Sequence, residues 1–420
     1  MKRRMTYWMR WNIRRGLVQR TRQYMVRYLG RSGLILGLAA AMGAVFPMAA
    51  FAASPEFART QEDWARLQDN TIEYEEIPDL IHEYNATVQN NQYDYRKFRE
   101  DYGDTNSEVA DAYNDLAQDF YNDMSGETDA GSMMSDLQLE IQAKNMMEQS
   151  DNTLEDSRIY LMTYEMAEDN LAASAQSNMI SYHKKLLELE QKQADLELAR
   201  EKYSLEQIKQ GAGTATAVEV LSSWESMQST ENSMKELESE IANVKENLCI
   251  SLGWKHNDTP EISALPEADL SRIDEMDPDR DLEAAVEHNY MLKINKRKLE
   301  NARSQTTRES LEAKIKNNEK QIGASLSGAY KSVLSARLSY EQALAAAQLE
   351  ETNTQIAEGK LQAGMVTGLE YKEQQYKMES SRLSAQMAAI ELFQAMETYD
   401  WSVKGLASAE ESSGDMSRGK

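Results

Sequence analysis

The side chains that most often carry chemistry are scarce in this sequence or lack the spacing that chemistry needs. Carboxylates are abundant, with 70 Asp and Glu residues, so no single pair stands out as a general acid and base. There is no phosphate-binding loop, dinucleotide fingerprint or nucleophile elbow. The four histidines are too scattered for a metal-ligand pattern, and we expect them on helix surfaces: His82, His183, His256 and His288. We therefore predict that the protein is not an enzyme and has no catalytic residue, metal site or cofactor.

The charge of the chain is distributed unevenly. The first 52 residues hold ten basic side chains and no acidic one, so the net charge of −24 becomes about −34 beyond residue 52. Such an acidic chain has no basic patch to bind the phosphates of a nucleic acid. It is equally unsuited to an anionic membrane surface.

The N-terminus has the pattern of a secretory signal. A basic stretch ends at Arg31, an apolar run extends over residues 34–45, and Ala50-Phe51-Ala52 predicts cleavage before Ala53. An uncleaved anchor is the alternative, although the run is short against the roughly 20 apolar residues of a membrane span. The stretch before the apolar run is unusually long, and a start at Met25 would give a signal of ordinary length. Our hypothesis is that translation starts at Met25, and N-terminal sequencing of an unprocessed precursor that begins at Met1 would contradict it.

Proline positions and apolar spacing predict long helices. No proline lies between residues 79 and 259 or after residue 278, and proline breaks a helix interior. Apolar residues recur three or four apart, as in Met234, Leu237, Ile241, Val244, Leu248 and Leu252. The only cysteine, Cys249, lies on this stripe, so no internal disulfide forms and its side chain should be buried. Narrow stripes of this kind favour antiparallel helices packed like coiled coils.

The two halves of the chain carry the same local motif. Gly213-Thr-Ala-Thr-Ala-Val-Glu219 aligns with Gly364-Met-Val-Thr-Gly-Leu-Glu370, and Tyr84-Asn85 aligns more weakly with His288-Asn289. Glycine follows helix ends, whereas threonine with glutamate three residues later forms a capping box at a helix start. Each motif therefore predicts the tip of a tight helical hairpin.

We divide the chain at these signals. The predicted parts are a signal peptide (1–52), an N-terminal linker (53–76), a first helical repeat (77–254), a proline-containing linker (255–280), a second helical repeat (281–407) and a disordered tail (408–420).

The tips and their flanking helices resemble those of the TolC-type outer membrane efflux proteins. The resemblance is carried by the sequence from Gln207 to Leu221 and, more closely, by Gly359 to Glu373, and it covers roughly residues 77 to 407. In that family three chains form a hollow helical barrel, and the tips meet a periplasmic adaptor (membrane fusion protein) that couples the duct to a pump. The resemblance implies adaptor contacts at Gly211, Gly213, Thr216, Gly364, Met365, Val366 and Thr367.

Two acidic residues after the second tip match the entrance constriction of the family, Glu370 and Glu373. Each has a simpler explanation, because acids are favoured in the first turn of any helix. Glu370 is the capping carboxylate of its motif, and Glu373 suits a solvated helix face.

The sequence departs from the family where transmembrane β-strands are inserted between the helices of each half. The corresponding segments, 104–124 and 304–325, lack the alternating pattern of such strands. We therefore expect an all-α, barrel-less relative: long antiparallel helical hairpins in two tandem repeats, packed like coiled coils. The aromatic stretch from Tyr93 to Tyr121 has two explanations, packing at the end of the bundle or contact with a cell-wall glycan or partner.

Together these features predict an exported component of an efflux or export system. It would form an extracytoplasmic helical duct as a homotrimer and work with an adaptor and a pump in transmembrane transport. Its place would be the cell envelope, in an outer membrane only if the host has one. The alternative is a structural or adaptor coiled coil of the envelope that encloses no channel; a stable oligomer favours the duct and a monomer favours this alternative.

Overall fold

The computed structural model describes residues 59–255 and 258–409. The chain separates into two units, 1–59 and 60–420, and Arg59 is the one described residue of the first. The predicted signal peptide, its cleavage site and the start at Met25 lie outside the described residues, as do His256 and residues 410–420.

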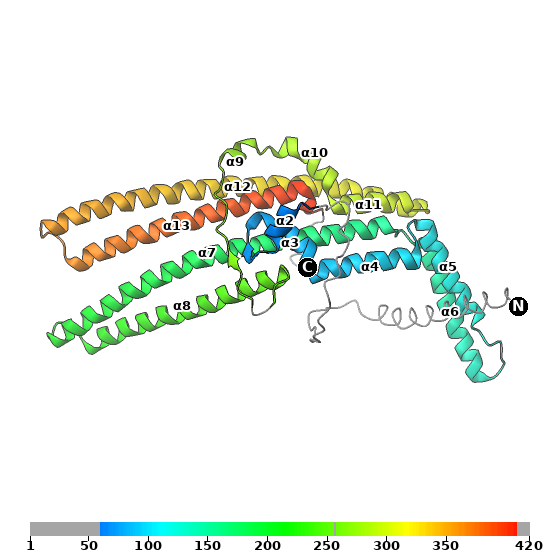
Figure 1. Ribbon diagram of the computed structural model, residues 1–420, viewed down its shortest axis with the longest axis horizontal. Helices are drawn as coiled ribbons and strands as arrows, with labels where there is room; N and C mark the ends of the chain where they lie inside the picture. The colour runs from blue at the N-terminus through cyan, green and yellow to red at the C-terminus, as the bar shows by residue number, and fades with distance from the viewer. Residues whose placement is uncertain (1–58, 256–257, 410–420) are drawn as a thin grey trace, which may run out of the picture. The chain divides into compact units, whose positions relative to one another are not determined.

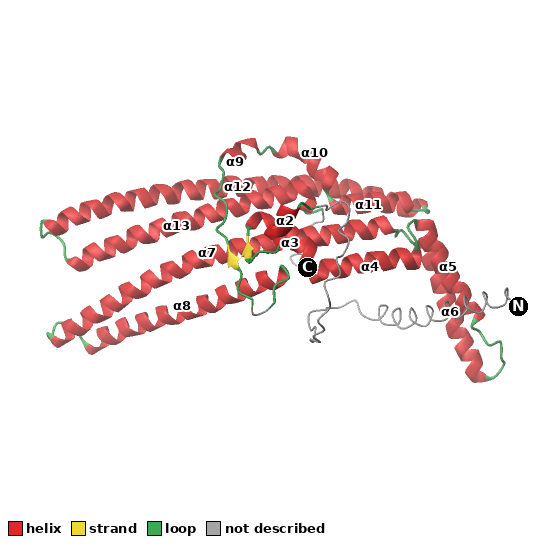
Figure 2. Ribbon diagram, in the orientation of Figure 1, coloured by secondary structure: helices red, strands yellow, loops and turns green. Residues whose placement is uncertain are grey.

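The prediction of an all-α protein is confirmed. Within the described residues the strands are β1 (Thr71–Ile72) and β2 (Glu261–Ile262), which pair in parallel with Thr71 opposite Glu261 (Figure 2). The remaining regular elements are helical. No helix in the described part of the chain is both long enough and apolar enough to span a bilayer.

The helices follow one another in two similar series. The first comprises α2 (Gln61–Leu67), η2 (Tyr74–Glu76), α3 (Ile77–Tyr84), α4 (Ala86–Tyr102), α5 (Asn106–Asn122), α6 (Ala130–Asn152), α7 (Ser157–Gly211) and α8 (Ala217–Ser251). The second comprises α9 (Ser271–Glu275), α10 (Pro278–His288), α11 (Tyr290–Asn301), α12 (Gln305–Gln362), α13 (Gly368–Trp401) and η3 (Ser402–Leu406). The order α3, α4, α7, α8 thus corresponds to α10, α11, α12, α13, and the α5–α6 hairpin is additional in the first series. The segments 104–124 and 304–325, where the family carries strands, are helical over most of their length.

Two long hairpins form the largest part of the described structure. α7 packs along α8, and α12 along α13, while α7 and α13 join one hairpin to the other (Figure 1). The four helices therefore lie in the order α8, α7, α13, α12. At 1.5 Å per residue, the 55 residues of α7 extend about 80 Å.

The core lies where α8 and α13 end and where the first halves of α7 and α12 pass beside the short helices. One cluster joins α3 to α7 and the end of α8, through residues such as Leu80, Met179 and Leu248. A second joins α10 and α11 to α12 and α13, through residues such as Leu292 and Ile322. Of the 35 residues of α8, only Leu248 and Cys249 are buried, so the prediction for the cysteine is confirmed. Toward the tips the hairpins bury little apolar surface within this chain.

In each series, the side chain of an asparagine near the start donates hydrogen bonds to backbone carbonyls at the end. Asn85 caps α4 and donates from Nδ2 to the carbonyl of Ser251, at 2.8 Å, at the end of α8. Asn289 caps α11 and donates to the carbonyls of Gly405 and Ala407, at 3.1 and 2.8 Å, after α13. The weakly matched dipeptides of the sequence therefore occupy equivalent places in the two series.

Three aromatic side chains of the stretch after Tyr93 contact one another and Tyr160 where α4, α5 and α7 meet: Phe98, Tyr102 and Tyr113. The rings of Phe98 and Tyr160 stack with centroids 4.0 Å apart, and Tyr102 lies 5.8 Å from Tyr113. Burial raises the pKa of Tyr102 and of Tyr160 to about 12. These four rings pack the end of the bundle, whereas Tyr93 itself is exposed.

Candidate functional site

The predicted site residues lie at the tips of the two long hairpins. At the first tip Gly213 has a positive φ of 75°, which lets the N–H of Thr214 donate to the carbonyl of Lys209 at 2.8 Å. At the second tip Gly364 has a φ of 70°, and the N–H of Met365 donates to Lys360 at 2.8 Å. This is the Schellman arrangement, in which a glycine satisfies the last carbonyls of a helix. The tips thus have the same backbone geometry for the same local reason.

The helix that leaves each tip begins with a complete capping box. The Thr216 side chain accepts from the N–H of Glu219 while the Glu219 carboxylate accepts from the N–H of Thr216, and Thr367 and Glu370 repeat the pair. The backbone hydrogen bond lowers the pKa of both Glu219 and Glu370 below its ordinary value. Glu370 therefore makes the contacts of a helix-capping carboxylate.

The second predicted constriction residue, Glu373, is an ion-pair partner on the seam between the hairpins. Its carboxylate lies 3.0 Å from Lys202 of α7, and one residue earlier Lys372 pairs with Glu201. Further from the tip, Tyr376 donates to Asp195. Side chains that are this exposed contribute at most about 1 kcal/mol per pair, so the seam near the tips is polar and weak.

The tips present apolar side chains to solvent. Met365 is 76% exposed and Val218 is 74% exposed, and nothing lies within 4 Å of the position of a Cβ on Gly211, Gly213 or Gly364. Val218 is followed on α8 by Leu221 and Trp224, both exposed, so the first tip extends beyond the predicted residues. In the sequence, these residues could have been found only from their spacing of three, because the repeated motif covers only the turn.

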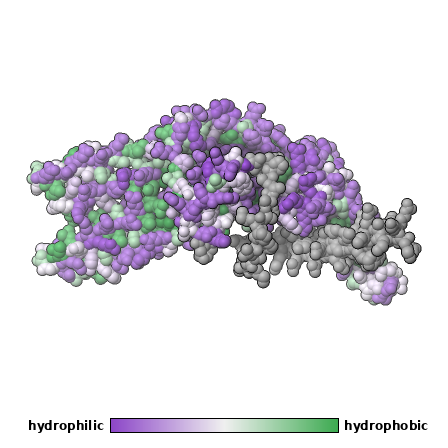
Figure 3. Space-filling model, viewed as in Figure 1, coloured by the Kyte–Doolittle hydropathy of each residue, from purple (hydrophilic) through white to green (hydrophobic). Residues whose placement is uncertain are grey.

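An apolar stripe also runs along the outer face of α12. Leu334, Leu338, Leu349 and Ile356 are all exposed, and the spacing puts them on one side of the helix together with Ala345. Opposite this stripe, Val333 is fully buried. Apolar residues are visible on the long hairpins in the left half of Figure 3. α12 therefore has two apolar faces, of which this chain covers one.

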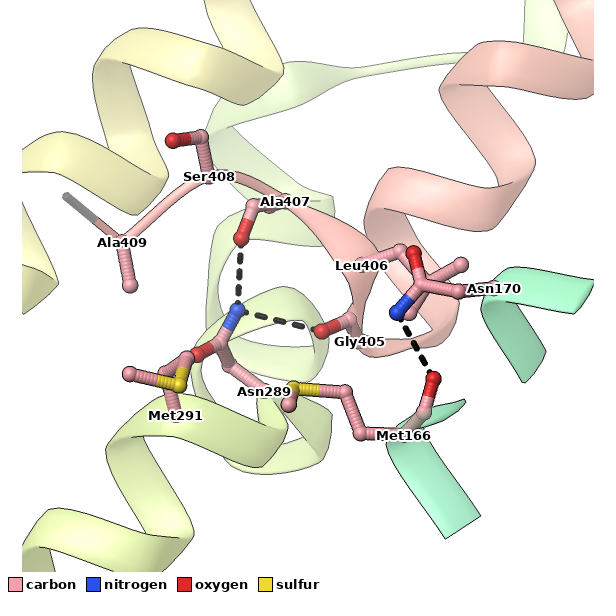
Figure 4. A pocket seen from close by; sticks show the side chains of 9 residues that line it. All are labelled: Met166, Asn170, Asn289, Met291, Gly405, Leu406, Ala407, Ser408 and Ala409. Atoms are coloured by element: carbon pink, nitrogen blue, oxygen red, sulfur yellow. Dashed lines mark hydrogen bonds between the residues drawn. The ribbon is translucent and has the colours of Figure 1, made fainter. Parts of the chain in front are cut away.

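An open pocket of about 230 Å³ adjoins the last described residues of the chain (Figure 4). Its walls are Met166, Asn170, Asn289, Met291 and the backbone segment Gly405–Ala409. No titratable side chain lines it, and the amide of Asn289 is already bonded to two carbonyls of that segment. The pocket is the place where the second series closes, and its lining offers no chemistry of its own.

The histidines do not gather into a site. His82 lies 2.6 Å from Glu168, and Nε2 of His183 lies 2.8 Å from the carbonyl of Ser263, where burial lowers its pKa. Both residues lie on helices, as the sequence predicts, and each has intermediate burial. Within residues 59–255 and 258–409 no group of three His, Cys, Asp or Glu side chains could hold a metal ion.

Comparison with known proteins gives matches among solved structures. No protein-family model and no curated protein matches the sequence. A membrane protein from Pseudomonas aeruginosa is 12% identical, with a TM-score of 0.49 over 77% of this chain and 93% of that one. The CmeC outer membrane channel of Campylobacter jejuni is 12% identical, with a TM-score of 0.46 over 90% and 96%. The outer membrane protein VceC of Vibrio cholerae is 11% identical, with a TM-score of 0.45 over 81% and 98%.

These matches include outer membrane channels, the class that the sequence resemblance indicates. At such identities and TM-scores the likeness assigns no activity or partner to this chain.

Proposed function

We propose that this protein is a component of an export system and that several copies form a helical duct outside the cytoplasm. The observation that carries the proposal is the pair of open edges of the four-helix layer. Because α7 and α13 face each other, α8 and α12 are left as the outer helices. Both expose apolar side chains that this chain does not cover, Leu221 and Trp224 on α8 and the stripe that contains Leu338 on α12.

Two unlike edges on one molecule suit a head-to-tail contact. When the α12 edge of one copy meets the α8 edge of the next, the interface is heterologous, and such contacts close into a ring if the rotation permits. Packing along these edges would bury apolar surface that otherwise remains in water, at about 25 cal/mol per Å². The resemblance to TolC-type proteins suggests three copies, and therefore a tube of twelve long helices.

In this assembly the tips would gather at one end of the tube and contact an adaptor that couples it to a pump. Met365, Val366 and Thr367, with Gly211, Gly213, Gly364 and Thr216, are the proposed contact residues. Exposed apolar side chains on an acidic chain, such as Met365, support this role. Glu370 and Glu373 would line the entrance, and the acidic tube would favour cationic solutes over anionic ones. The mechanism is passive, because transport would be driven by the pump.

The first test is the native mass of residues 53–420 by light scattering over a range of concentrations. We expect a stable oligomer whose end-on view in electron micrographs has a hollow centre. Leu338→Glu should reduce the mass toward that of the monomer, because it puts a charge on the edge that the neighbouring copy would bury. Ser339→Glu, which adds the same charge one residue later and off the stripe, should leave the mass unchanged. A monomer at every concentration would favour the structural or adaptor coiled coil instead.

The adaptor contact needs a separate test in cells. Met365→Glu lies at the tip and away from both edges, so it should keep the native mass and abolish export. Export at the wild-type level by an assembled Met365→Glu variant would contradict the assignment of the tip.

A further inference from the structure

The α5–α6 hairpin is a well-fixed element. Its turn is held by Asp136, whose carboxylate accepts from the backbone N–H groups of Ser125 and Gly126 at 2.8 and 2.9 Å. At its base, Asn106 donates to the carbonyl of Thr153 at 2.9 Å, and Ser157 donates to that of Asp104 at 3.0 Å. Because Ser157 begins α7, the hairpin lies at the end of α7 opposite the tip (Figure 1).

α6 has two apolar faces, and α5 covers only one of them. Leu139, Ala143 and Met146 are buried on the inner face. On the opposite side the helix exposes four large apolar residues, here called the outer face of α6: Met133, Met134, Leu137 and Ile141. All four are more than half exposed, so they contribute little to the stability of the hairpin itself.

The four residues of the outer face carry no charge, which is unusual in so acidic a chain. The charged residues between 130 and 147 are Asp136, Glu140 and Lys144. Asp136 is occupied in the turn, and Glu140 pairs with Lys144 at 2.7 Å. One flank of the apolar residues is neutral, with Gln138, Gln142 and Asn145, and the other flank carries Asp136, Glu140 and Lys144.

α5 has the opposite character. It carries four acidic residues and no basic one, namely Glu108, Asp111, Asp115 and Asp119. Two copies of the α5 surface would bring carboxylates together, whereas two copies of the outer face of α6 would bring apolar side chains together, with the Glu140–Lys144 ion pair at the margin. The distribution of charge therefore selects which side of the hairpin can approach an identical hairpin.

We propose that the outer face of α6 packs against the same face in a second copy of this chain. The inference rests on the proposed function. The face spans only about two helical turns, so the area that it could bury is far less than the roughly 800 Å² per partner of a stable complex. Copies that are already joined along α8 and α12 would bring their hairpins together around the common axis at the end remote from the tips. The occupant is a second copy rather than lipid, because an interfacial helix needs flanking basic residues and the hairpin is acidic.

The test is cysteine cross-linking of the chain 53–420 in a Cys249→Ala background. Leu137→Cys places a thiol on the outer face, and Gln118→Cys places a matched thiol on the exposed side of α5. A disulfide requires Cα atoms within about 7 Å, so only residues that meet at an interface should react readily. Under a mild oxidant we expect a covalent dimer from Leu137→Cys and only background levels from Gln118→Cys.

The outcomes separate this inference from the proposed function. An oligomer by light scattering with no cross-link at residue 137, or with equal cross-linking at residue 118, would overturn the hairpin contact and leave the duct intact. A chain that is monomeric at every concentration and gives no cross-link would overturn both. If the chain sediments with phosphatidylcholine vesicles and Leu137→Glu releases it, the face meets lipid and the proposal is wrong.

Discussion

Replacement of Asn289 by alanine should selectively destabilise the second series of helices. The side chain is 1% exposed and makes three hydrogen bonds, accepting from Leu292 N at 3.0 Å and donating to the carbonyls of Gly405 and Ala407. Loss of an N-cap costs about 1 kcal/mol. Each carbonyl that loses its donor should lower the free energy of unfolding by about 1–2 kcal/mol. This is toward the lower end of the usual cost of a carbonyl without a donor, because the open pocket admits water beside these groups. The free energy of unfolding should therefore fall by about 3–5 kcal/mol.

Two further substitutions separate the parts of this effect. Asn85→Ala removes a cap and a single donation, to Ser251, so it should cost less, about 2–3 kcal/mol. Asn289→Asp keeps the cap but replaces the donor by an acceptor that faces two carbonyls, so it should not restore stability. Urea unfolding followed by far-UV circular dichroism gives the totals, and hydrogen exchange over residues 402–409 reports the local closure. A loss below about 1 kcal/mol for Asn289→Ala, or unchanged exchange over residues 402–409, would refute the proposed closure.

Three other predictions follow from the same structure. Asp156 is fully buried and its carboxylate lies 2.6 Å from Arg297, so Asp156→Ala should cost about 3–5 kcal/mol in urea unfolding, and a loss near zero would contradict this. Gly253 has a φ of 88° and its missing Cβ would collide with Tyr84, so Gly253→Ala should lower the melting temperature measurably, while Gly328→Ala, in open space within α12, should not. The pKa of Glu370 is lowered in the folded state, so its capping contribution is complete above the unfolded pKa of about 4.3 and is lost as the pH falls through the folded value. A carboxyl titration by NMR should give a value below 4.3 that rises in Thr367→Ala, and an unshifted wild-type value would refute the capping box.

The sequence alone determined the features that depend on neighbours along the chain. The tips at Gly213 and Gly364 were predictable because a Schellman turn and a capping box use hydrogen bonds between residues at most five apart. The helices themselves were predictable from proline positions and from spacing of three and four, and Cys249 was predictably buried because it lies on such a stripe.

The tertiary structure decided which helix faces are covered, because this depends on the neighbour that each helix acquires. The residues Leu338 and Val333 lie on the same helix with similar local patterns, yet one is exposed and the other fully buried. In the same way, only the packing of α5 on α6 distinguishes Leu139 from Leu137. The contacts of His82 with Glu168 and of His183 with Ser263 join residues 86 and 80 positions apart, so no local pattern predicts them. Spacing defines an apolar stripe, but only the arrangement of the helices in space determines whether this chain or another molecule must bury it.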